Sequence, residues 1–261
     1  MSELAHASGL DVAYESALGD AAVGDPLEYW KHCDTPMCEY WRATERENGG
    51  VGHPNFKPVR PCVSAAHIYG KRRVAAESFT AMALCWDESL HELKARAVDH
   101  FAKGVTHTVT HTYTHDPRKD GKAPGTSFGT IIGSPFLRGQ TWWSFMPTFT
   151  GWLADCCAFL ERGHAVVDVL RYIGDDVGPR PDELEYFPDG YKCDFLNPDA
   201  LRSRVSVVAD GRFVLPDGMS YSVLWLPDSV FLSKAHAERI AALERKGGKV
   251  VRGDIDAKMS A

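Results

Sequence analysis

The hydrophobic positions fall into short apolar runs and longer amphipathic stretches, a pattern that predicts an α/β protein. Apolar runs of strand length occupy 10–14 (LDVAY), 74–76 (VAA), 166–173 (VVDVLRYI) and 221–226 (YSVLWL). Apolar residues at helical spacing predict helices over 86–103, 149–162 and 234–246. Each of these helices ends beside a glycine, a common helix terminator. Strands that alternate with helices indicate βαβ units and a parallel sheet.

Residues 105–115 (VTHTVTHTYTH) have threonine at every even position, and such β-branched alternation predicts a strand. Residues four apart on a strand are separated by roughly 13 Å, so His107, His111 and His115 cannot share one metal ion. We expect His111 and His115 to bind substrate near the end of the strand, and His107 to lie in the core. A metal-dependent hydrolase built on these histidines remains an alternative.

Two acids end predicted strands. The stretch 65–80 (AAHIYGKRRVAAESFT) predicts a turn at 69–70, a strand over 74–76 and Glu77 at the strand's end; Glu15 follows the strand over 10–14. An α/β barrel places its chemistry at the carboxyl ends of its strands. Glu77 is therefore a candidate catalytic carboxylate, although a Glu near a helix start is the alternative.

Residues 26–41 (PLEYWKHCDTPMCEYW) place Asp34 and Glu39 among aromatic residues. Sugar sites combine carboxylates, which bind hydroxyl groups, with aromatic rings, which cover the apolar faces of pyranoses. This composition predicts sugar-binding roles for both acids. An aromatic core with solvated acids is the alternative.

A long loop rich in glycine, proline and basic residues covers 116–139, and long ordered loops are often functional. Gln140 at its end offers both a donor and an acceptor, which suits a sugar hydroxyl. Trp142 and Trp143 are adjacent and point different ways, so at most one of them lines a cleft. We place Gln140 and Trp142 among the substrate-binding residues.

The last third of the chain predicts a hairpin and the start of a doubly wound α/β domain. Asp210-Gly211 separates two β-type runs, which is a strong hairpin signal. Ser233 is placed to cap the helix over 234–246. Because the sequence has no G-x-G-x-x-G and no P-loop, nucleotide binding has no support.

Composition narrows the class of protein. The 261 residues are 44% hydrophobic and 25% charged, as in soluble globular proteins, and suffice for one large domain or one and a half smaller ones. A net charge of −6 argues against nucleic acid or an anionic membrane as partner. The start of the chain lacks the features of a signal peptide, so the default expectation is a cytoplasmic protein. None of the seven cysteines forms a C-x-x-C pair, which favours reduced, buried thiols.

With these motifs in view, the chain resembles the bacterial glycoside hydrolases related to glycoside hydrolase family 106, the α-L-rhamnosidases. The matching stretches follow the order of the family and cover most of residues 10–252. They are GDPLEYWKHCDTPMCEYW, AAHIYGKRRVAAESFT, GVTHTVTHTYTHDP, GQTWW, VVDVLRYIGDD and LPDGMSYSVLWLP. Two motifs depart from the family: its HxxxHQP has Asp116 in place of Gln, and its Gly-Glu-Asp has Asp175 in place of Glu.

The resemblance implies a fragment of a larger enzyme. Residues 1–163 would be the C-terminal part of a (β/α)₈ TIM-type catalytic barrel, and residues 164–261 the truncated start of a flavodoxin-like or amidotransferase-like doubly wound domain. Further domains or chains would complete the barrel. The implied activity is hydrolysis of terminal sugars, chiefly rhamnose, with inversion and with calcium assisting. A non-catalytic, carbohydrate-binding remnant of such an enzyme is the alternative.

Glycoside hydrolysis generally uses two carboxyl groups that flank the scissile bond. Our candidates for them are Glu77, Glu15 and Glu39. Glu77 is the first choice, and Glu15 is favoured as the second because it also ends a predicted strand. Glu39 and Asp34 are then expected to be sugar or calcium ligands.

Overall fold

A computed structural model describes residues 2–16, 24–42, 59–81, 86–113, 135–176 and 190–253. The helices are α1 (Ser2–Ala7), α2 (Pro26–Lys31), α3 (Val59–Ile68), α4 (Leu90–Ala102), the 3₁₀ turn η2 (Trp143–Phe145), α5 (Met146–Leu160), α6 (Pro198–Ser203) and α7 (Lys234–Arg245). The strands are β1 (Ala13–Glu15), β2 (Thr35–Trp41), β3 (Ala75–Thr80), β4 (His107–Thr110), β5 (Val169–Tyr172), β6 (Cys193–Leu196), β7 (Ser206–Val207), β8 (Phe213–Val214), β9 (Ser220–Tyr221), β10 (Val223–Leu226) and β11 (Val250–Arg252). None of the described helices is long and apolar enough to cross a membrane.

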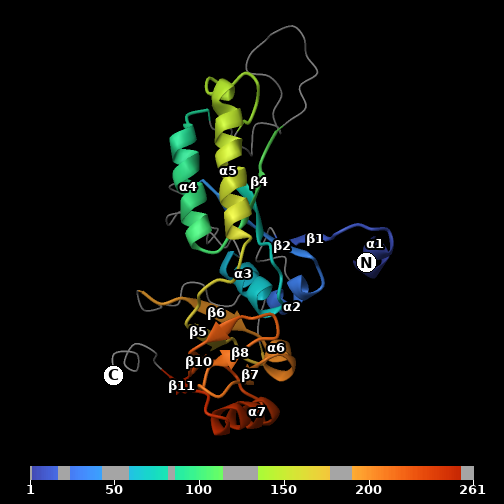
Figure 1. Cartoon of the computed structure of the whole chain (residues 1–261), viewed down its shortest axis with the longest axis vertical. Helices are drawn as coiled ribbons and strands as arrows, with labels where there is room; N and C mark the ends of the chain where they lie inside the picture. The colour runs from blue at the N-terminus through green and yellow to red at the C-terminus, as the bar shows by residue number, and fades with distance from the viewer. Residues whose placement is uncertain are drawn as a thin grey trace.

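The first sheet has the order β1-β2-β3-β4, and all of its neighbouring strands are parallel. Helices α2, α3 and α4 connect successive strands, and α5 follows β4, so this part of the chain is a run of βα units (Figure 1). One face of the sheet packs against the helices, where Tyr40, Phe79 and Phe149 form a cluster of buried rings. Because side chains alternate along a strand, the opposite face carries the residues between these positions.

Strand β3 contains an irregularity at Phe79, which has a φ of 73°. A positive φ is unusual for a bulky residue, and it coincides with a shift in register: Tyr40 pairs with Ser78, but Trp41 pairs with Thr80. The extra residue keeps the Phe79 ring in the core and turns Thr80 to the face opposite the helices, where it bonds Glu77. Bulges of this kind re-aim side chains and are common beside active sites.

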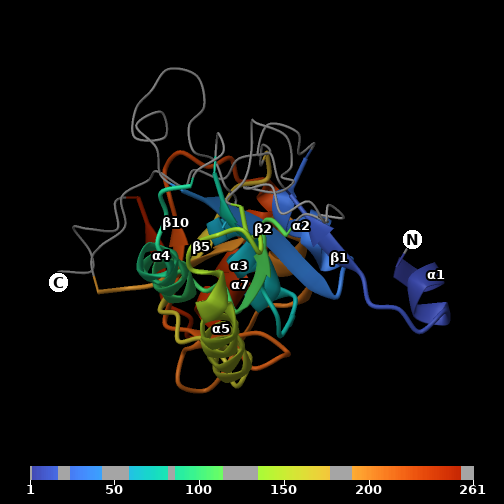
Figure 2. The ribbon, with the colours of Figure 1, turned by 90° about the horizontal axis from the view of Figure 1, so that it is seen from above.

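The second sheet has the order β11-β10-β5-β6, again with parallel neighbours. Counted along the chain, its four strands lie in the order 2-1-3-4. Helices α6 and α7 pack beside one another next to this sheet, and β7, β8 and β9 form a small antiparallel sheet (Figure 1). Viewed from above, α1 lies at the edge of the molecule (Figure 2), where Ser2 bonds the Tyr14 hydroxyl at 3.1 Å and His6 bonds Asp34 at 2.8 Å.

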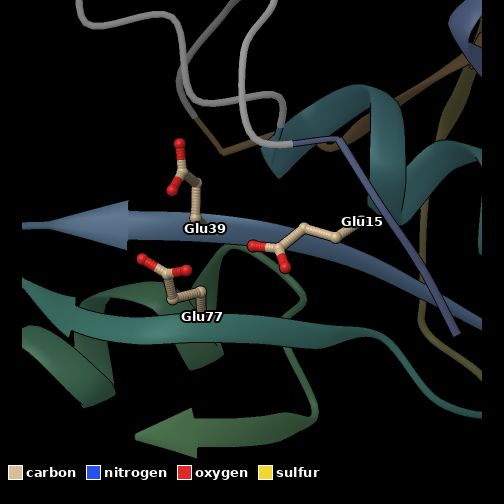
Figure 3. A group of neighbouring side chains, drawn as sticks. All are labelled: Glu15, Glu39 and Glu77. Carbon is tan, nitrogen blue, oxygen red and sulfur yellow. The ribbon is translucent and has the colours of Figure 1, made fainter. Parts of the chain in front are cut away.

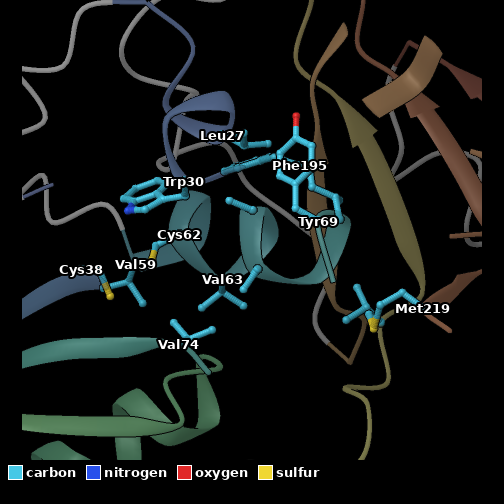
Figure 4. Packing of buried hydrophobic residues seen from close by; sticks show 14 of the residues in the cluster. Leu27, Trp30, Cys38, Val59, Cys62, Val63, Tyr69, Val74, Phe195 and Met219 are labelled. Atoms are coloured by element: carbon cyan, nitrogen blue, oxygen red, sulfur yellow. The ribbon is translucent and has the colours of Figure 1, made fainter. Parts of the chain in front are cut away.

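Helix α3 lies between the two parallel sheets and contacts both β2 and β6 (Figure 4). Its Ser64 and His67 side chains both bind Asp194 of β6, with His67 Nδ1 2.8 Å from Asp194 Oδ2. Tyr221 donates to the same carboxylate at 2.9 Å, and the Asp194 side chain is only 4% exposed. A buried acid with three donors therefore fastens the second sheet to α3.

The sequence analysis was wrong about four elements of the first sheet and its helices. It ended the strand before Glu77, whereas β3 continues to Thr80 and Glu77 is its third residue. It predicted neither α3 nor β2, the latter because Pro36 and the surrounding aromatic residues obscured the strand pattern. The strand expected over 105–115 is shortened to β4, after which His111 lies in a turn.

The three predicted helices, now α4, α5 and α7, and the hairpin are confirmed close to their predicted bounds. Ser89 caps α4 in a reciprocal arrangement with Glu92, Ser233 caps α7, and β7 pairs with β8 across the Asp210-Gly211 turn. The six described cysteines are free thiols, and most of them are buried, in agreement with the prediction.

Candidate active site

Three glutamates from adjacent strands meet on the face of the first sheet that the helices leave uncovered. Glu15 is the last residue of β1, Glu39 is in β2, and Glu77 of β3 is the register partner of Glu39. Glu15 pairs with Met37, two residues before Glu39, so all three side chains emerge on the same side. One carboxylate oxygen from each lies within 4.8 Å of the others, and the side chains point toward one another (Figure 3).

This cluster is crowded with like charges. Glu39 is 2% exposed, and Glu15 and Glu77 are partly buried. Carboxylates this close cannot all stay ionised without cost unless a cation, a proton or hydrogen-bond donors compensate their charge. The arrangement therefore favours ligands that bring positive charge or hydroxyl groups.

Nearby side chains supply some of these donors. Trp41 Nε1 donates to Glu39 Oε2 at 2.8 Å, and the Thr80 hydroxyl donates to Glu77 Oε1. His111 Nδ1 lies 4.0 Å from the same oxygen of Glu77. Sequence reasoning placed His111 near Glu77 but missed Thr80, because only the bulge at Phe79 turns Thr80 to this face.

Asp34 is not part of the cluster. It directly precedes β2, at the amino end of the strand, and its carboxylate binds His6 Nε2 and the Val12 N–H, both at 2.8 Å. The hydrogen bond from His6, followed by that from Val12, lowers the pKa of Asp34. The expectation that Asp34 binds sugar or calcium together with Glu39 is therefore not met by this geometry.

Gln140 and Trp142 lie near the packing of α4 and α5 rather than against the glutamates. Gln140 is 7% exposed. The indole of Trp142 donates to the Glu88 carbonyl at 2.9 Å and meets the Phe136 ring at 5.7 Å. Among the described residues, no hydrogen bond or ion pair joins either side chain to the three acids. His115 lies outside the described residues.

The two described histidines of the alternating stretch, His107 and His111, bind different partners. His107 Nδ1 binds Glu161 of the segment after α5 at 3.0 Å, while His111 lies beside Glu77. Within the described ranges, Glu15, Glu39 and Glu77 are the only group of three or more metal-ligating side chains close enough to hold an ion. This distribution gives no support to a metal-dependent hydrolase built on histidines.

The glutamate cluster does fit a hard divalent cation. Calcium binds carboxylate oxygens at about 2.3–2.6 Å, so two oxygens on one ion lie at most about 5.2 Å apart. The 4.8 Å limit on the three carboxylate oxygens satisfies this condition. Three carboxylates also provide the all-oxygen donor set that calcium requires.

Comparison with known proteins identifies the family of this chain. The model of glycoside hydrolase family 106, described as alpha-L-rhamnosidase, matches residues 1–258. A protein of Formosa agariphila named "Putative beta-glucuronidase" is 31% identical over 253 residues, which are 95% of this chain and 20% of that protein. The solved structure of a rhamnosidase from Novosphingobium sp. PP1Y superposes with a TM-score of 0.83 at 27% identity, covering 97% of this chain and 24% of the rhamnosidase.

The chain thus spans about a fifth to a quarter of the length of these relatives. The match covers both parallel sheets, including the strands that carry the three acids. On this evidence the chain belongs to glycoside hydrolase family 106, the alpha-L-rhamnosidases.

Proposed function

We propose that this chain supplies one wall of the active site of a glycoside hydrolase that removes a terminal sugar, of the α-L-rhamnoside type, from a polysaccharide. The observation that carries the proposal is the convergence of Glu15, Glu39 and Glu77 on one face of a parallel sheet. Membership of the family supports glycoside hydrolysis as the reaction class.

The proposed architecture follows from the two sheets. Residues 1–163 hold four consecutive parallel strands with helices on one side, as in part of a (β/α)₈ barrel. Residues 164–261 hold a sheet whose strand order, 2-1-3-4, is that of the start of a flavodoxin-like doubly wound domain. In such a barrel the inner face carries the glutamates, and further strands of a longer protein close the ring between β1 and β4.

The spacing of the glutamates limits their roles. Inverting glycosidases separate their two carboxyl groups by roughly 6.5–9.5 Å to admit a water molecule, which is farther than the nearest oxygens of this cluster. At most one of the three then belongs to an inverting pair, and the geometry does not favour Glu15 as the partner of Glu77. We assign the catalytic role to Glu77, which has Thr80 and His111 beside it.

Glu15 and Glu39 would then hold a calcium ion together with Glu77, as the family resemblance suggests. A bound calcium ion would offset the crowded negative charge and orient sugar hydroxyls as a Lewis acid. Trp41 holds the Glu39 carboxylate, and Thr80 holds that of Glu77, so both acids have a fixed orientation toward the site. Glu77 would exchange a proton with the glycosidic oxygen or with water, and the second carboxyl would come from outside the described residues.

The test is turnover of an aryl α-L-rhamnoside by the full chain. Glu77→Gln keeps the side-chain volume but cannot take up or release the proton, so the rate should fall on the order of 10²–10⁴-fold. Glu238→Gln on exposed α7 makes the same change away from the site and should leave the rate unchanged. Full activity of Glu77→Gln, with a normal circular dichroism spectrum, would remove this residue from the mechanism.

Chemical rescue separates the other two acids. If one of them acts as a base, azide should restore turnover to its alanine variant, whereas it should not rescue a cation ligand. We expect no rescue for Glu15→Ala or Glu39→Ala, and instead the loss of calcium-induced thermal stabilisation in both. Rescue of Glu15→Ala would return this residue to the catalytic pair.

A second candidate function is carbohydrate binding without hydrolysis. It is favoured by one observation: the chain covers only 20–24% of its relatives, while a barrel site draws residues from several strands. Binding of a rhamnoside that depends on Glu39 and Glu77, together with no turnover by the unaltered chain, would select this function.

A further inference from the structure

A separate cavity of about 650 Å³ lies at the other end of the first sheet. Its lining includes Val74, just before β3, and Val105 and Thr106, just before β4, so it opens at the amino ends of the strands. The segment that follows α5 and the β8–β9 turn form its other walls. The cavity therefore lies where the two parallel sheets meet, and ligand pockets commonly form at such junctions.

The charged residues around this cavity are mainly basic. Lys71, Arg72 and Arg162 line it and form no ion pair within the described ranges. Lys192, a further lining residue, only donates to the Ala102 carbonyl at 3.4 Å. In a chain with a net charge of −6, such a group of basic side chains forms a local attractor for anions.

The acids at this cavity are already neutralised. Asp217 lines the cavity, but its carboxylate binds Arg204. The other nearby acid, Asp194, is buried and binds His67. Both carboxylates have a basic partner of their own, so an anionic ligand would meet Lys71 and Arg162, which form no ion pair among the described residues.

An exposed aromatic ring completes the site. Phe159 lines the cavity and is 72% exposed, although it lies near the end of a well-packed helix. An aromatic face beside cationic side chains suits a sugar ring that carries an acidic group, because the ring covers the apolar face of the pyranose while the cations bind the acid. The volume is within the range of sites for small organic ligands, about 300–1,000 Å³.

We infer that this junction cavity is a second carbohydrate site, which binds an anionic saccharide bearing a carboxylate or a sulfate through Lys71, Arg162 and the Phe159 ring. The choice of saccharide over other anions rests on the proposed glycosidase function. The cavity lies away from the glutamate cluster, so it would hold a charged polysaccharide chain rather than the sugar being cleaved.

The experiment is isothermal titration calorimetry of the full chain with tetragalacturonate. We expect saturable binding that weakens about tenfold or more in the Lys71→Ala/Arg162→Ala double variant, since each cation contributes a charge-assisted hydrogen bond. Arg245→Ala/Lys246→Ala, at the exposed end of α7, removes the same net charge and should bind as the unaltered chain does. Equal weakening in both double variants would reduce the effect to general charge and overturn the site.

Three further ligands test the chemistry. The methyl ester of tetragalacturonate keeps the shape without the charge and should not bind; binding as tight as that of the acid would overturn the inference. A sulfated tetrasaccharide that competes supports the site and compares the two acidic groups. Inorganic sulfate that binds as tightly as the tetrasaccharides would show a simple anion site and refute saccharide recognition.

The Glu77→Gln variant separates this inference from the proposed reaction. We expect it to lose turnover and to keep tetragalacturonate binding, because Glu77 projects from the face of β3, whereas the cavity lies before the amino ends of β3 and β4. Loss of binding in this variant would place the ligand at the glutamates and overturn the second site. Binding that persists in a chain without turnover would support the cavity even if the proposed function fails.

Discussion

The glutamate cluster and Asp194 are two ways of burying acids in one small molecule. Around Asp194, three donors from α3 and the second sheet converge on a single carboxylate. Around Glu39, two further carboxylates converge beside the Trp41 donor, and one oxygen from each acid lies within 4.8 Å of the others. The donors around Asp194 compensate its charge and hold α3 and the second sheet together. The three carboxylates around Glu39 accumulate like charge, which favours the binding of a ligand. Burial alone therefore does not identify a functional acid; what surrounds the acid does.

The largest effect is expected at Asp194. Asp194→Ala leaves His67, Ser64 and Tyr221 without their shared acceptor, and removing one partner of a buried ion pair typically costs about 3–5 kcal/mol of unfolding free energy. Urea denaturation followed by tryptophan fluorescence measures this loss. Asp155→Ala, on the exposed side of α5, should change the free energy by less than about 0.5 kcal/mol. Similar stability for both variants would contradict the fastening role.

Thr80→Val tests the orientation of Glu77. Valine has nearly the shape of threonine but cannot donate to the carboxylate, and a hydrogen bond to a charged group is worth about 1.5–3 kcal/mol. Such a loss in the transition state lowers the rate by roughly 10–100-fold. We expect the change in kcat for an aryl rhamnoside rather than in KM. Thr150→Val on α5 is the matched control, and an unchanged kcat for Thr80→Val would refute a positioning role.

Glu39→Gln should raise the stability of the protein, whereas Asp194→Ala lowers it. Removing one of three crowded charges relieves repulsion, and relief of strain at a functional site commonly stabilises a protein by about 0.5–2 kcal/mol. In calcium-free buffer we expect a higher Tm for the variant than for the unaltered chain, and a smaller rise in Tm when calcium is added. A lower Tm with an undiminished calcium response would show that the cluster is not charge-strained.

The smallest expected effect is the pH dependence of stability that arises from the pair of His67 and Asp194. Burial acts to lower the pKa of His67, but the charge and hydrogen bond of Asp194 outweigh it, so the pKa is raised above its usual value. The pair then stabilises the fold fully below the unfolded pKa of about 6.5, and this stability is lost as the pH rises through the folded-state value. Urea midpoints should fall as the pH rises from about 6.5 through the folded-state pKa, and His67→Gln should remove this dependence. The exposed His91→Gln should retain it, and an equal slope in His67→Gln would contradict the assignment.

Local signals were enough for part of the fold. The cap at Ser89, the helical spacing of α4 and the Asp210-Gly211 turn depend on neighbouring residues only, and each predicted its element. Helix α3 was missed because it is buried almost all round between two sheets, so it shows little amphipathic pattern. Strand β2 was missed because Pro36 lies near its start.

The site was predictable in its residue types more than in its geometry. Glu15 and Glu77 were selected because they were expected to end strands, which holds for Glu15 but not for Glu77. Asp34 was selected from composition alone, and the register of β2 puts it at the opposite end from Glu39. The contribution of Thr80 depends on ring packing around Phe79, which no local pattern encodes.

The bulge at Phe79 reverses the alternation of side chains along β3. Upstream of it, odd-numbered residues face the acids; downstream, even-numbered residues do. In a regular strand with the same sequence, Phe79 rather than Thr80 would face the acids, so the cleft and core faces of the strand's end would be exchanged. A sequence alignment or a design that counts from Glu77 in steps of two would therefore place the Phe79 ring beside the acids, where the structure has the Thr80 hydroxyl.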